Sequence, residues 1–254
     1  MKTTKDIRIA VLIDADNVPS ANVKAMLEEI AKYGTPTFKR IYGDWTKPNL
    51  TGWKNVLLEN AITPIQQYGY TTGKNSTDSA MIIDAMDILY SEKVDAFSIV
   101  SSDSDFTRLA IRLREAGMTV IGIGERKTPN PFIVACDKFI YLEILTTADV
   151  KVKVEFGKTE KKTPVELEAI QKVDKETINL LANSIADLAD DSGWAFLGEV
   201  GSLVIKKQPD FDARNFGYAK LAPMLKSIDK FEVDERETDK KGIKLVYVRV
   251  KNKG

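Results

Sequence analysis

Two acidic clusters follow apolar runs in this chain, and their spacing indicates chemistry at a shared site. The first is "IDADN", residues 13–17, which carries Asp14 and Asp16. The second is "SSDSD", residues 101–105, which carries Asp103 and Asp105. Clustered carboxylates separated by small polar residues can take up protons or hold a divalent cation, and oxygen-only ligands favour Mg²⁺ or Mn²⁺.

The amino-acid inventory excludes several common mechanisms. The 254-residue chain contains no histidine and one cysteine. Serine–histidine–aspartate triads, histidine zinc sites, two-histidine ribonuclease chemistry and intramolecular disulfides are therefore impossible. The lone Cys136 lies in the apolar stretch "PFIVACDKF", which is typical of a buried residue. Chemistry must depend on carboxylates, lysines, hydroxyls or a metal held by oxygen.

A third acidic contribution comes from the pattern "KNSTDSAMIIDAMDIL", which predicts a helix over residues 76–92. Ser76 or Thr77 can cap it, which places Asp78 in its first turn, where a carboxylate also favours the helix dipole. Positions 78, 82, 85 and 89 share one face and the last three are apolar, so Asp78 is expected at the end of a buried stripe. Asp84 lies on another side of the helix and has no clear target.

Unpaired carboxylates about 4 Å apart would repel by about 4 kcal/mol per pair at an effective dielectric near 20. Proton uptake or a divalent cation would relieve this repulsion. The alternative for each single aspartate is helix capping: Asp105 could cap a helix at 106, and Asp16 or Asn17 a helix at 19.

The elements that must position these residues alternate between strand and helix. Apolar runs predict strands at 7–14, 37–44, 62–69, 96–103, 119–125 and 139–145. Helical patterns lie between them, at 19–34, 51–61, 76–92 and 105–117. This alternation predicts an α/β, Rossmann-like parallel sheet with helices on both faces. With the strand order 3-2-1-4-5, the first and fourth strands are neighbours where the order reverses, so both acidic clusters meet in one crevice.

A charged segment without apolar periodicity, residues 147–170, predicts a linker between a domain at 1–146 and a second at 171–254. The second domain shows three helical patterns and two terminal strands joined by a polar turn. This combination predicts a small winged helix-turn-helix domain.

Composition gives only weak guidance on partners and location. The 37 basic and 37 acidic residues cancel, so any basic surface must be local. No signal-peptide core and no apolar stretch long enough to span a bilayer are evident, so we expect a cytoplasmic protein without a membrane partner.

Three segments in order, "VLIDADNV", "STDSAMIIDAMDIL" and "IVSSDSDFTRLA", resemble the NYN domain, a branch of the PIN-like nucleases. The C-terminal region resembles the LOTUS domain, also called OST-HTH. The resemblance implies metal-dependent cleavage of RNA. It implies that Asp14, Asp78, Asp103 and Asp105 hold Mg²⁺ or Mn²⁺, with Asn17 orienting a ligand or phosphate. Ser102 departs from the pattern, because many relatives carry glycine there.

Further polar residues are candidates to assist or to contact RNA. Asp16, Ser101 and Ser104 would support the site, the two serines as hydrogen-bond donors to phosphate. The candidate RNA-contacting cations are Lys74, Arg108, Arg126, Lys127, Lys206, Lys207, Arg214 and Lys220. Phe216 and Tyr218 could stack on bases, although we expect one of them to belong to the core. The resemblance also allows the C-terminal module to bind a protein partner.

Two other functions fit parts of the sequence. "DADNV" matches the D-x-D-x-[TV] pattern of haloacid-dehalogenase-like phosphatases, in which Asp14 would be the nucleophile and Asp16 the general acid. Against this, that family inserts a segment after its first strand, whereas Pro19 opens a helix here at once. The other alternative is a non-catalytic RNA-binding regulator.

Overall fold

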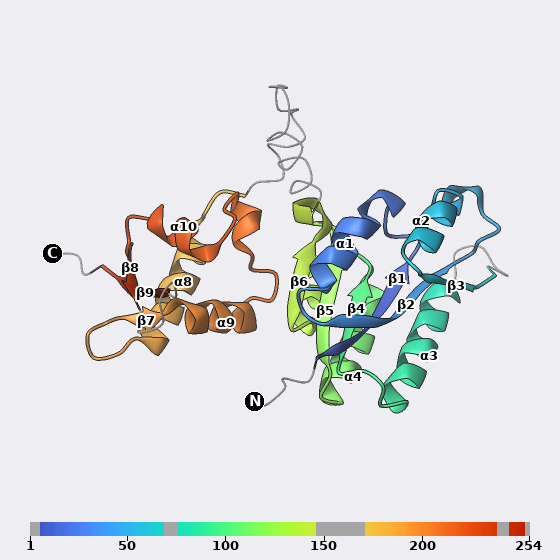
Figure 1. Cartoon of the computed structure of the whole chain (residues 1–254), viewed down its shortest axis with the longest axis horizontal. Helices are drawn as coiled ribbons and strands as arrows, with labels where there is room; N and C mark the ends of the chain where they lie inside the picture. Colours follow the sequence, from blue (N-terminus) through green and yellow to red (C-terminus); the bar gives the residue numbers. More distant parts are fainter. Residues whose placement is uncertain (1–5, 69–75, 146–170, 238–243, 252–254) are drawn as a thin grey trace, which may run out of the picture. The chain divides into compact units, whose positions relative to one another are not determined.

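The computed structural model of the chain describes residues 6–68, 76–145, 171–237 and 244–251 (Figure 1). The chain divides into two compact units, residues 1–159 and 160–254. The predicted linker at 147–170 lies outside the described residues, so its boundaries stay predictions.

The first unit is built on a parallel six-stranded sheet with the order β3-β2-β1-β4-β5-β6. Its strands are β1 (Arg8–Asp14), β2 (Thr35–Gly43), β3 (Thr63–Gln66), β4 (Ala96–Val100), β5 (Thr119–Gly124) and β6 (Lys138–Tyr141). The central strands β1 and β4 are buried almost throughout, as expected for strands covered on both faces. The predicted topology is confirmed, including the reversal of strand order between β1 and β4.

Helices cover both faces of this sheet (Figure 1). One face packs against α1 (Val23–Ile30) and α2 (Trp53–Glu59) through a core that includes Ile9, Val11 and Ile13. The opposite face packs against α3 (Ser76–Tyr90), α4 (Thr107–Glu115) and α5 (Asn130–Ala135) through the alternate residues Ala10 and Leu12. Strand periodicity therefore divides one apolar run between two cores.

In the first unit, short 3-10 turns precede three of the described helices. Two of them are η1 (Ser20–Asn22) before α1 and η3 (Ser104–Phe106) before α4. The third turn, η2 (Pro48–Leu50), precedes α2. Three predicted strands are too long, since β3 ends at Gln66 rather than 69, β4 at Val100 rather than 103 and β6 at Tyr141 rather than 145. After β4, the backbone N–H of Ser101 still donates to the Ile123 carbonyl, and the hydroxyl groups of Ser101 and Ser102 form side-chain hydrogen bonds at the sheet edge.

Among its described residues, the second unit combines three helices with a three-stranded antiparallel sheet of order β7-β9-β8. Its elements are α8 (Lys175–Leu188), β7 (Ala195–Phe196), α9 (Leu197–Lys207), η4 (Ala213–Phe216), α10 (Leu221–Lys226), β8 (Phe231–Glu237) and β9 (Lys244–Val250). One core joins the helices to one face of the sheet through residues such as Leu181, Val204 and Val248. The predicted small C-terminal domain of helices and an antiparallel hairpin is confirmed.

Within the described residues, no helix is both long and apolar enough to cross a membrane.

Candidate metal centre

The carboxyl ends of β1 and β4 bring the two acidic clusters to one edge of the sheet. The two strands pair in parallel up to Ile13 opposite Val100, so Asp14 and the segment that begins at Ser101 leave the sheet side by side. On the other side of β1, Asp14 lies opposite Tyr42 of β2. The predicted convergence of residues almost ninety positions apart therefore follows from the register of the sheet.

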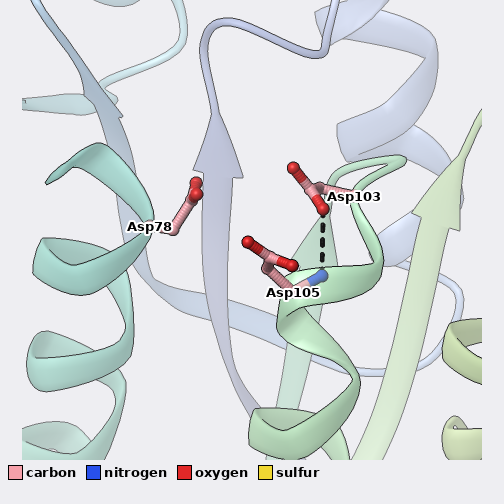
Figure 2. Close-up of side chains that lie close together, drawn as sticks. All are labelled: Asp78, Asp103 and Asp105. Atoms are coloured by element: carbon pink, nitrogen blue, oxygen red, sulfur yellow. Dashed lines mark hydrogen bonds between the residues drawn. The ribbon is translucent and has the colours of Figure 1, made fainter. Parts of the chain in front are cut away.

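Three carboxylates form the closest cluster at this edge (Figure 2). Asp78 comes from the first turn of α3, Asp103 from the loop after β4, and Asp105 from η3. One oxygen atom of each lies within 4.8 Å of the others. Asp78 and Asp103 are half-buried, whereas Asp105 is exposed, so the cluster is open to solvent on one side.

The loop after β4 takes its shape from Asp103. Asp103 is the N-cap of η3, and its Oδ1 accepts a hydrogen bond from the backbone N–H of Asp105 at 2.9 Å. The capping alternative for Asp105 is therefore wrong, because the residue two positions earlier performs that role. Neither Asp16 nor Asn17 caps η1, whose N-cap is Pro19 without a side-chain hydrogen bond. The carboxylate of Asp105 thus points from the helix start toward Asp78 and Asp103.

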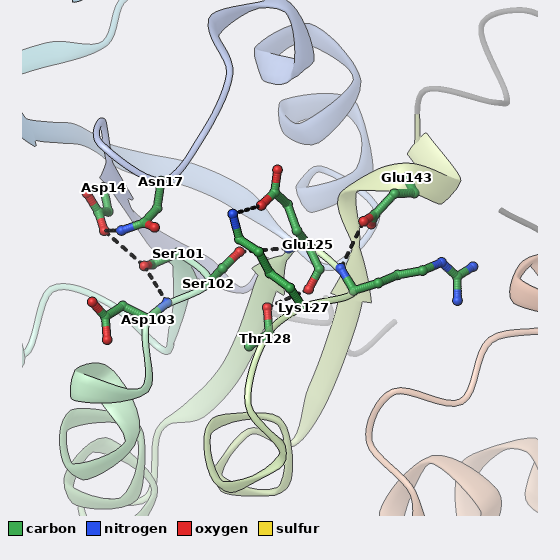
Figure 3. A network of polar contacts seen from close by, with 10 residues as sticks. Asp14, Asn17, Ser101, Ser102, Asp103, Glu125, Lys127, Thr128 and Glu143 are labelled. Atoms are coloured by element: carbon green, nitrogen blue, oxygen red, sulfur yellow. Dashed lines mark hydrogen bonds and ion pairs between the residues drawn. The ribbon is translucent and has the colours of Figure 1, made fainter. Parts of the chain in front are cut away.

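Asp14 lies beside this cluster in a buried hydrogen-bond network (Figure 3). Its Oδ2 accepts hydrogen bonds from the amide of Asn17 and from the Ser101 hydroxyl, and its Oδ1 accepts from the backbone N–H of Asp16. The Ser101 oxygen in turn accepts from the backbone N–H of Asp103 at 3.0 Å. Ser101 thus connects Asp14 to Asp103, and its one hydroxyl proton goes to Asp14 rather than to a phosphate.

The electrostatics of the cluster disfavour four ionised carboxylates without a counter-charge. Burial, together with the negative charges of Asp14, Asp103, Asp105 and Asp16, raises the pKa of Asp78 from 3.8 to about 6. Burial also raises the pKa of Asp14, against the lowering effect of its hydrogen bonds from Asn17 and Ser101. Asp16 is exposed and contributes to Asp78 mainly by its charge. The cluster is thus poised either to bind a proton or to bind a cation.

The carboxylate oxygens fit a hard divalent cation. One oxygen from each of Asp78, Asp103 and Asp105 lies within 4.8 Å of the others, which is compact enough for the three to share one ion at metal–oxygen distances of about 2.1 Å after small side-chain shifts. Every candidate donor is an oxygen, which excludes a structural zinc site of the thiolate or imidazole kind. Asp14, predicted as a fourth ligand, is within electrostatic reach of Asp78 but outside the group of three.

The supporting serine and the basic residues predicted to contact RNA near the cluster have different surroundings. Ser104 and Arg108 are exposed beside the cluster, and Lys127 pairs with Glu125. Arg126 is half-buried, with its guanidinium carbon 5.2 Å from the centre of the Tyr141 ring. Lys74 lies outside the described residues. Of these cations, Arg108 is the one that stands exposed on the helix following the cluster.

Ser102, where the resemblance leads one to expect glycine, is bonded to the neighbouring strand end rather than to the carboxylate cluster. Its hydroxyl oxygen accepts a hydrogen bond from the backbone N–H of Glu125 at 2.8 Å, and the residue is buried (Figure 3). The side chain thus fastens the end of β4 to the end of β5. A serine at this position therefore adds a hydrogen bond that supports the loop carrying Asp103.

Two further aspartates near this edge have structural roles that the sequence did not reveal. Asp84, on α3, accepts hydrogen bonds from Arg40 Nη1 and from the Tyr42 hydroxyl, both on β2. Asp44, directly after β2, is buried and accepts from Thr46 and from Gln66 of β3. A signal for Asp44 was present, because it ends a predicted strand as Asp14 does. No local signal identifies the partners of Asp84.

In the second unit the predicted RNA-contacting cations divide into two groups. Lys206 and Lys220 are exposed on α9 and at the start of α10. Lys207 pairs with Asp187, and Arg214 forms a forked pair with Asp212. Phe216 belongs to the core, and half-buried Tyr218 forms a hydroxyl contact with Ser227, so the expectation that one of these two aromatic residues is core is confirmed.

Comparison with known protein families matches two domain models to the chain, one after the other. The NYN domain model matches residues 8–143, and the OST-HTH/LOTUS domain model matches residues 168–243. No curated protein matches the chain.

Three solved structures are similar to parts of the chain. A protein of unknown function from Vibrio parahaemolyticus is 20% identical, with a TM-score of 0.46, and the match covers 55% of this chain and 94% of that one. An uncharacterized protein from Nitrosomonas europaea is 30% identical over 39% of this chain and 92% of its own, with a TM-score of 0.30. A fragment of a Chromobacterium violaceum protein is 32% identical over 33% of this chain and 89% of its own, with a TM-score of 0.27. By its family matches, the chain belongs to the NYN domain family and carries an OST-HTH/LOTUS domain after the NYN domain.

Proposed function

We propose that this protein is a metal-dependent ribonuclease that hydrolyses RNA phosphodiester bonds at the carboxyl edge of its parallel sheet. The observation that carries the proposal is the group of carboxylate oxygens from Asp78, Asp103 and Asp105 within 4.8 Å of one another. Membership of the NYN family supports nuclease chemistry, and the OST-HTH/LOTUS domain supports RNA as the substrate.

Asp78, Asp103 and Asp105 would hold Mg²⁺ or Mn²⁺, with Asp14 as a further ligand or as their charged neighbour. When bound, such an ion lowers the pKa of a water molecule and screens the charge that develops on the phosphate. The cluster itself has the surplus negative charge that a cation offsets, as the raised pKa of Asp78 indicates.

The neighbouring residues would fix the carboxylates rather than react. Asn17 and Ser101 both donate hydrogen bonds to Oδ2 of Asp14, and these bonds would fix the orientation of its carboxylate. Asp103 is oriented by the cap bond from Asp105 N–H. Arg108, exposed on α4 next to Asp105, is placed to attract the RNA backbone. Side chains that are already oriented by hydrogen bonds lose little conformational entropy when a substrate binds.

The phosphatase alternative has less support in the geometry. Its nucleophile would be Asp14, which is 1% exposed and accepts hydrogen bonds on both oxygens. Its general acid would be Asp16, which is exposed and lies outside the group of three carboxylates. In addition, η1 begins at Ser20, six residues after β1 ends, without an inserted flap between them.

The test compares cleavage of labelled single-stranded RNA by the wild type and by Asp103→Asn, each with Mn²⁺ and with EDTA. Asparagine keeps the oxygen that caps η3 but removes the charge, so the loop should keep its shape. We expect cleavage by the wild type with Mn²⁺ and its loss in the variant or in EDTA, with RNA affinity retained. Equal cleavage by both proteins would rule out the assigned site. Binding without cleavage by the wild type would favour the non-catalytic regulator.

A further inference from the structure

The solvent-facing side of the small sheet in the second unit carries an unusual set of planar side chains. Alternation along the strands places Phe231, Val233 and Val248 on the core side. The opposite side carries Glu232, Asp234, Arg236, Leu245, Tyr247 and Arg249, which pair across β8 and β9. Phe196 of β7 joins them opposite Tyr247, with the two ring centres 5.9 Å apart.

Trp194 completes this surface from the residue before β7. Its indole is half-buried, and its backbone is fixed by two hydrogen bonds with Asp190, of 2.9 and 3.0 Å. We refer to Trp194, Phe196, Tyr247, Arg236 and Arg249 as the aromatic face. All three rings are half-buried, although they lie on the side of the sheet away from the core.

Two guanidinium groups lie over these rings. The guanidinium carbon of Arg236 is 4.2 Å from the centre of the Tyr247 ring and 5.2 Å from that of Trp194. That of Arg249 is 4.7 Å from the Trp194 ring. The two side chains remain 42% and 40% exposed. The planar guanidinium groups of Arg236 and Arg249 therefore lie over the aromatic rings and remain partly exposed to solvent.

We propose that the aromatic face binds single-stranded RNA by stacking unpaired bases on its rings and guanidinium planes. Single-stranded RNA is recognised on such surfaces because every base has a π-face, whereas a duplex keeps its bases stacked inside. The inference rests on the proposed function, since RNA held there would be the substrate of the same chain. It moves the main contact surface from the lysines of α9 and α10 to the sheet.

The charges on this face predict the kind of binding. Arg236 pairs with Asp234 at 2.9 Å and Arg249 with Glu232 at 2.7 Å, so the face carries no net charge from these four residues. Few counterions would be released when RNA binds, and stacking rather than phosphate attraction would dominate. We therefore expect the contribution of this face to depend weakly on salt, whereas any contribution from Lys206 and Lys220 should fall steeply with it.

A protein partner is the competing occupant, because tryptophan, tyrosine and arginine are also common at protein interfaces. The aromatic face favours RNA because Leu245 is the one aliphatic side chain that the described strands add to this side. A protein interface would require a more apolar centre that excludes water.

The test measures binding of a fluorescein-labelled single-stranded oligoribonucleotide of mixed sequence to the full chain in EDTA, by fluorescence anisotropy. Tyr247→Leu keeps apolar volume but removes the ring, and Arg249→Lys keeps the charge but removes the plane. We expect each to weaken binding by about tenfold, in the range of one lost stacking contact. The comparison variant Lys206→Gln/Lys220→Gln should lose about twofold at physiological salt and flatten the salt dependence.

Circular dichroism melting of each variant separates lost contacts from lost folding. If Tyr247→Leu and Arg249→Lys remain folded and bind RNA as the wild type does, the aromatic face does not contact RNA. Cleavage assays distinguish this result from a failure of the nuclease proposal. A protein that cuts RNA with unchanged affinity in these variants refutes only the aromatic face. A protein that binds through this face but never cuts refutes only the nuclease.

Discussion

Asp78 and Asp84 lie six residues apart on α3 and have opposite electrostatic surroundings. Asp78 faces Asp14, Asp16, Asp103 and Asp105, all of which raise its pKa. Asp84 instead receives hydrogen bonds from Arg40 and Tyr42 on its two oxygens. On one helix, the negative charge of Asp78 at the sheet edge therefore lies among other negative charges. The charge of Asp84, less than two turns away, is matched by Arg40.

The contrast separates a group available for chemistry from a group that holds the scaffold. Asp84 fastens α3 to β2, the strand whose Tyr42 lies opposite Asp14. The same contact thereby fixes the distance between the Asp78 carboxylate and the end of β1. Structural aspartates have their partners within the fold, whereas a functional one in a cluster has its charge unmatched.

The largest expected effect is on cleavage. Replacing Asp78 by asparagine should reduce Mn²⁺-dependent RNA cleavage by about a thousandfold, which corresponds to about 4 kcal/mol of transition-state stabilisation. The reason is that the variant removes one of three carboxylates that would hold the ion. The measurement is the initial rate with labelled RNA. Asp87→Asn, an exposed position on the same helix, should leave the rate unchanged. A similar loss in both variants would show that α3 is simply damaged.

The second effect is on stability. Asp84→Ala should lower the opening free energy of the β2 and α3 amides by about 2–3 kcal/mol, because it leaves Arg40 without its ion-pair partner and the buried Tyr42 hydroxyl without its acceptor. Native-state hydrogen exchange measures this quantity. Asp84→Asn, which keeps an acceptor for Tyr42 but not the charge, should lose less. Equal losses in the two variants would mean that the lost charge of Asp84 accounts for the whole effect and that its hydrogen bond from Tyr42 contributes nothing.

The difference between these aspartates also explains what the sequence could predict. The convergence of Asp14, Asp78 and Asp103 followed from strand order and helix periodicity, which are local patterns combined with one topological rule. The partners of Asp84 could not be identified, because Arg40 and Tyr42 are more than forty residues away and belong to a different element. The capping alternative named Asp105 rather than Asp103, because sequence does not show where a strand ends and a turn begins to within two residues.

The third effect concerns Ser101, which joins the two acidic clusters. Ser101→Ala removes the proton donated to Asp14 and the acceptor for Asp103 N–H, both buried or half-buried. We expect a loss of about 1–2 kcal/mol in stability and a further rise in the pKa of Asp14, since the hydroxyl lowers that pKa. Carboxyl-detected NMR titration follows the pKa. Ser98→Ala is the matched control on β4, the strand that Ser101 directly follows, because the Ser98 hydroxyl has no hydrogen-bond partner among the described residues. If Ser98→Ala is as costly as Ser101→Ala, the network is not responsible.

The smallest predicted effect is a gain in stability, whereas the variants above lose activity or stability. Burial and neighbouring charges raise the pKa of Asp78 in the folded protein from 3.8 to about 6, so the folded state binds this proton more tightly than the unfolded state. The metal-free protein should therefore lose stability as pH rises from about 4 through about 6, because ionised Asp78 is disfavoured only in the folded state. Asparagine cannot ionise, so Asp78→Asn should stabilise the metal-free protein by about 1 kcal/mol at pH 7, after allowance for solvent screening.

Thermal unfolding in EDTA at pH 4 and pH 7 measures this gain, which should vanish at the lower pH. Asp84→Asn should show no such gain at neutral pH, because it removes a compensated charge. Added Mn²⁺ should reverse the order, stabilising the wild type more than Asp78→Asn, since the ion would bind to the native carboxylates and offset their repulsion. If Asp78→Asn is no more stable than the wild type in EDTA at pH 7, the carboxylates of the cluster do not repel one another enough to require a cation.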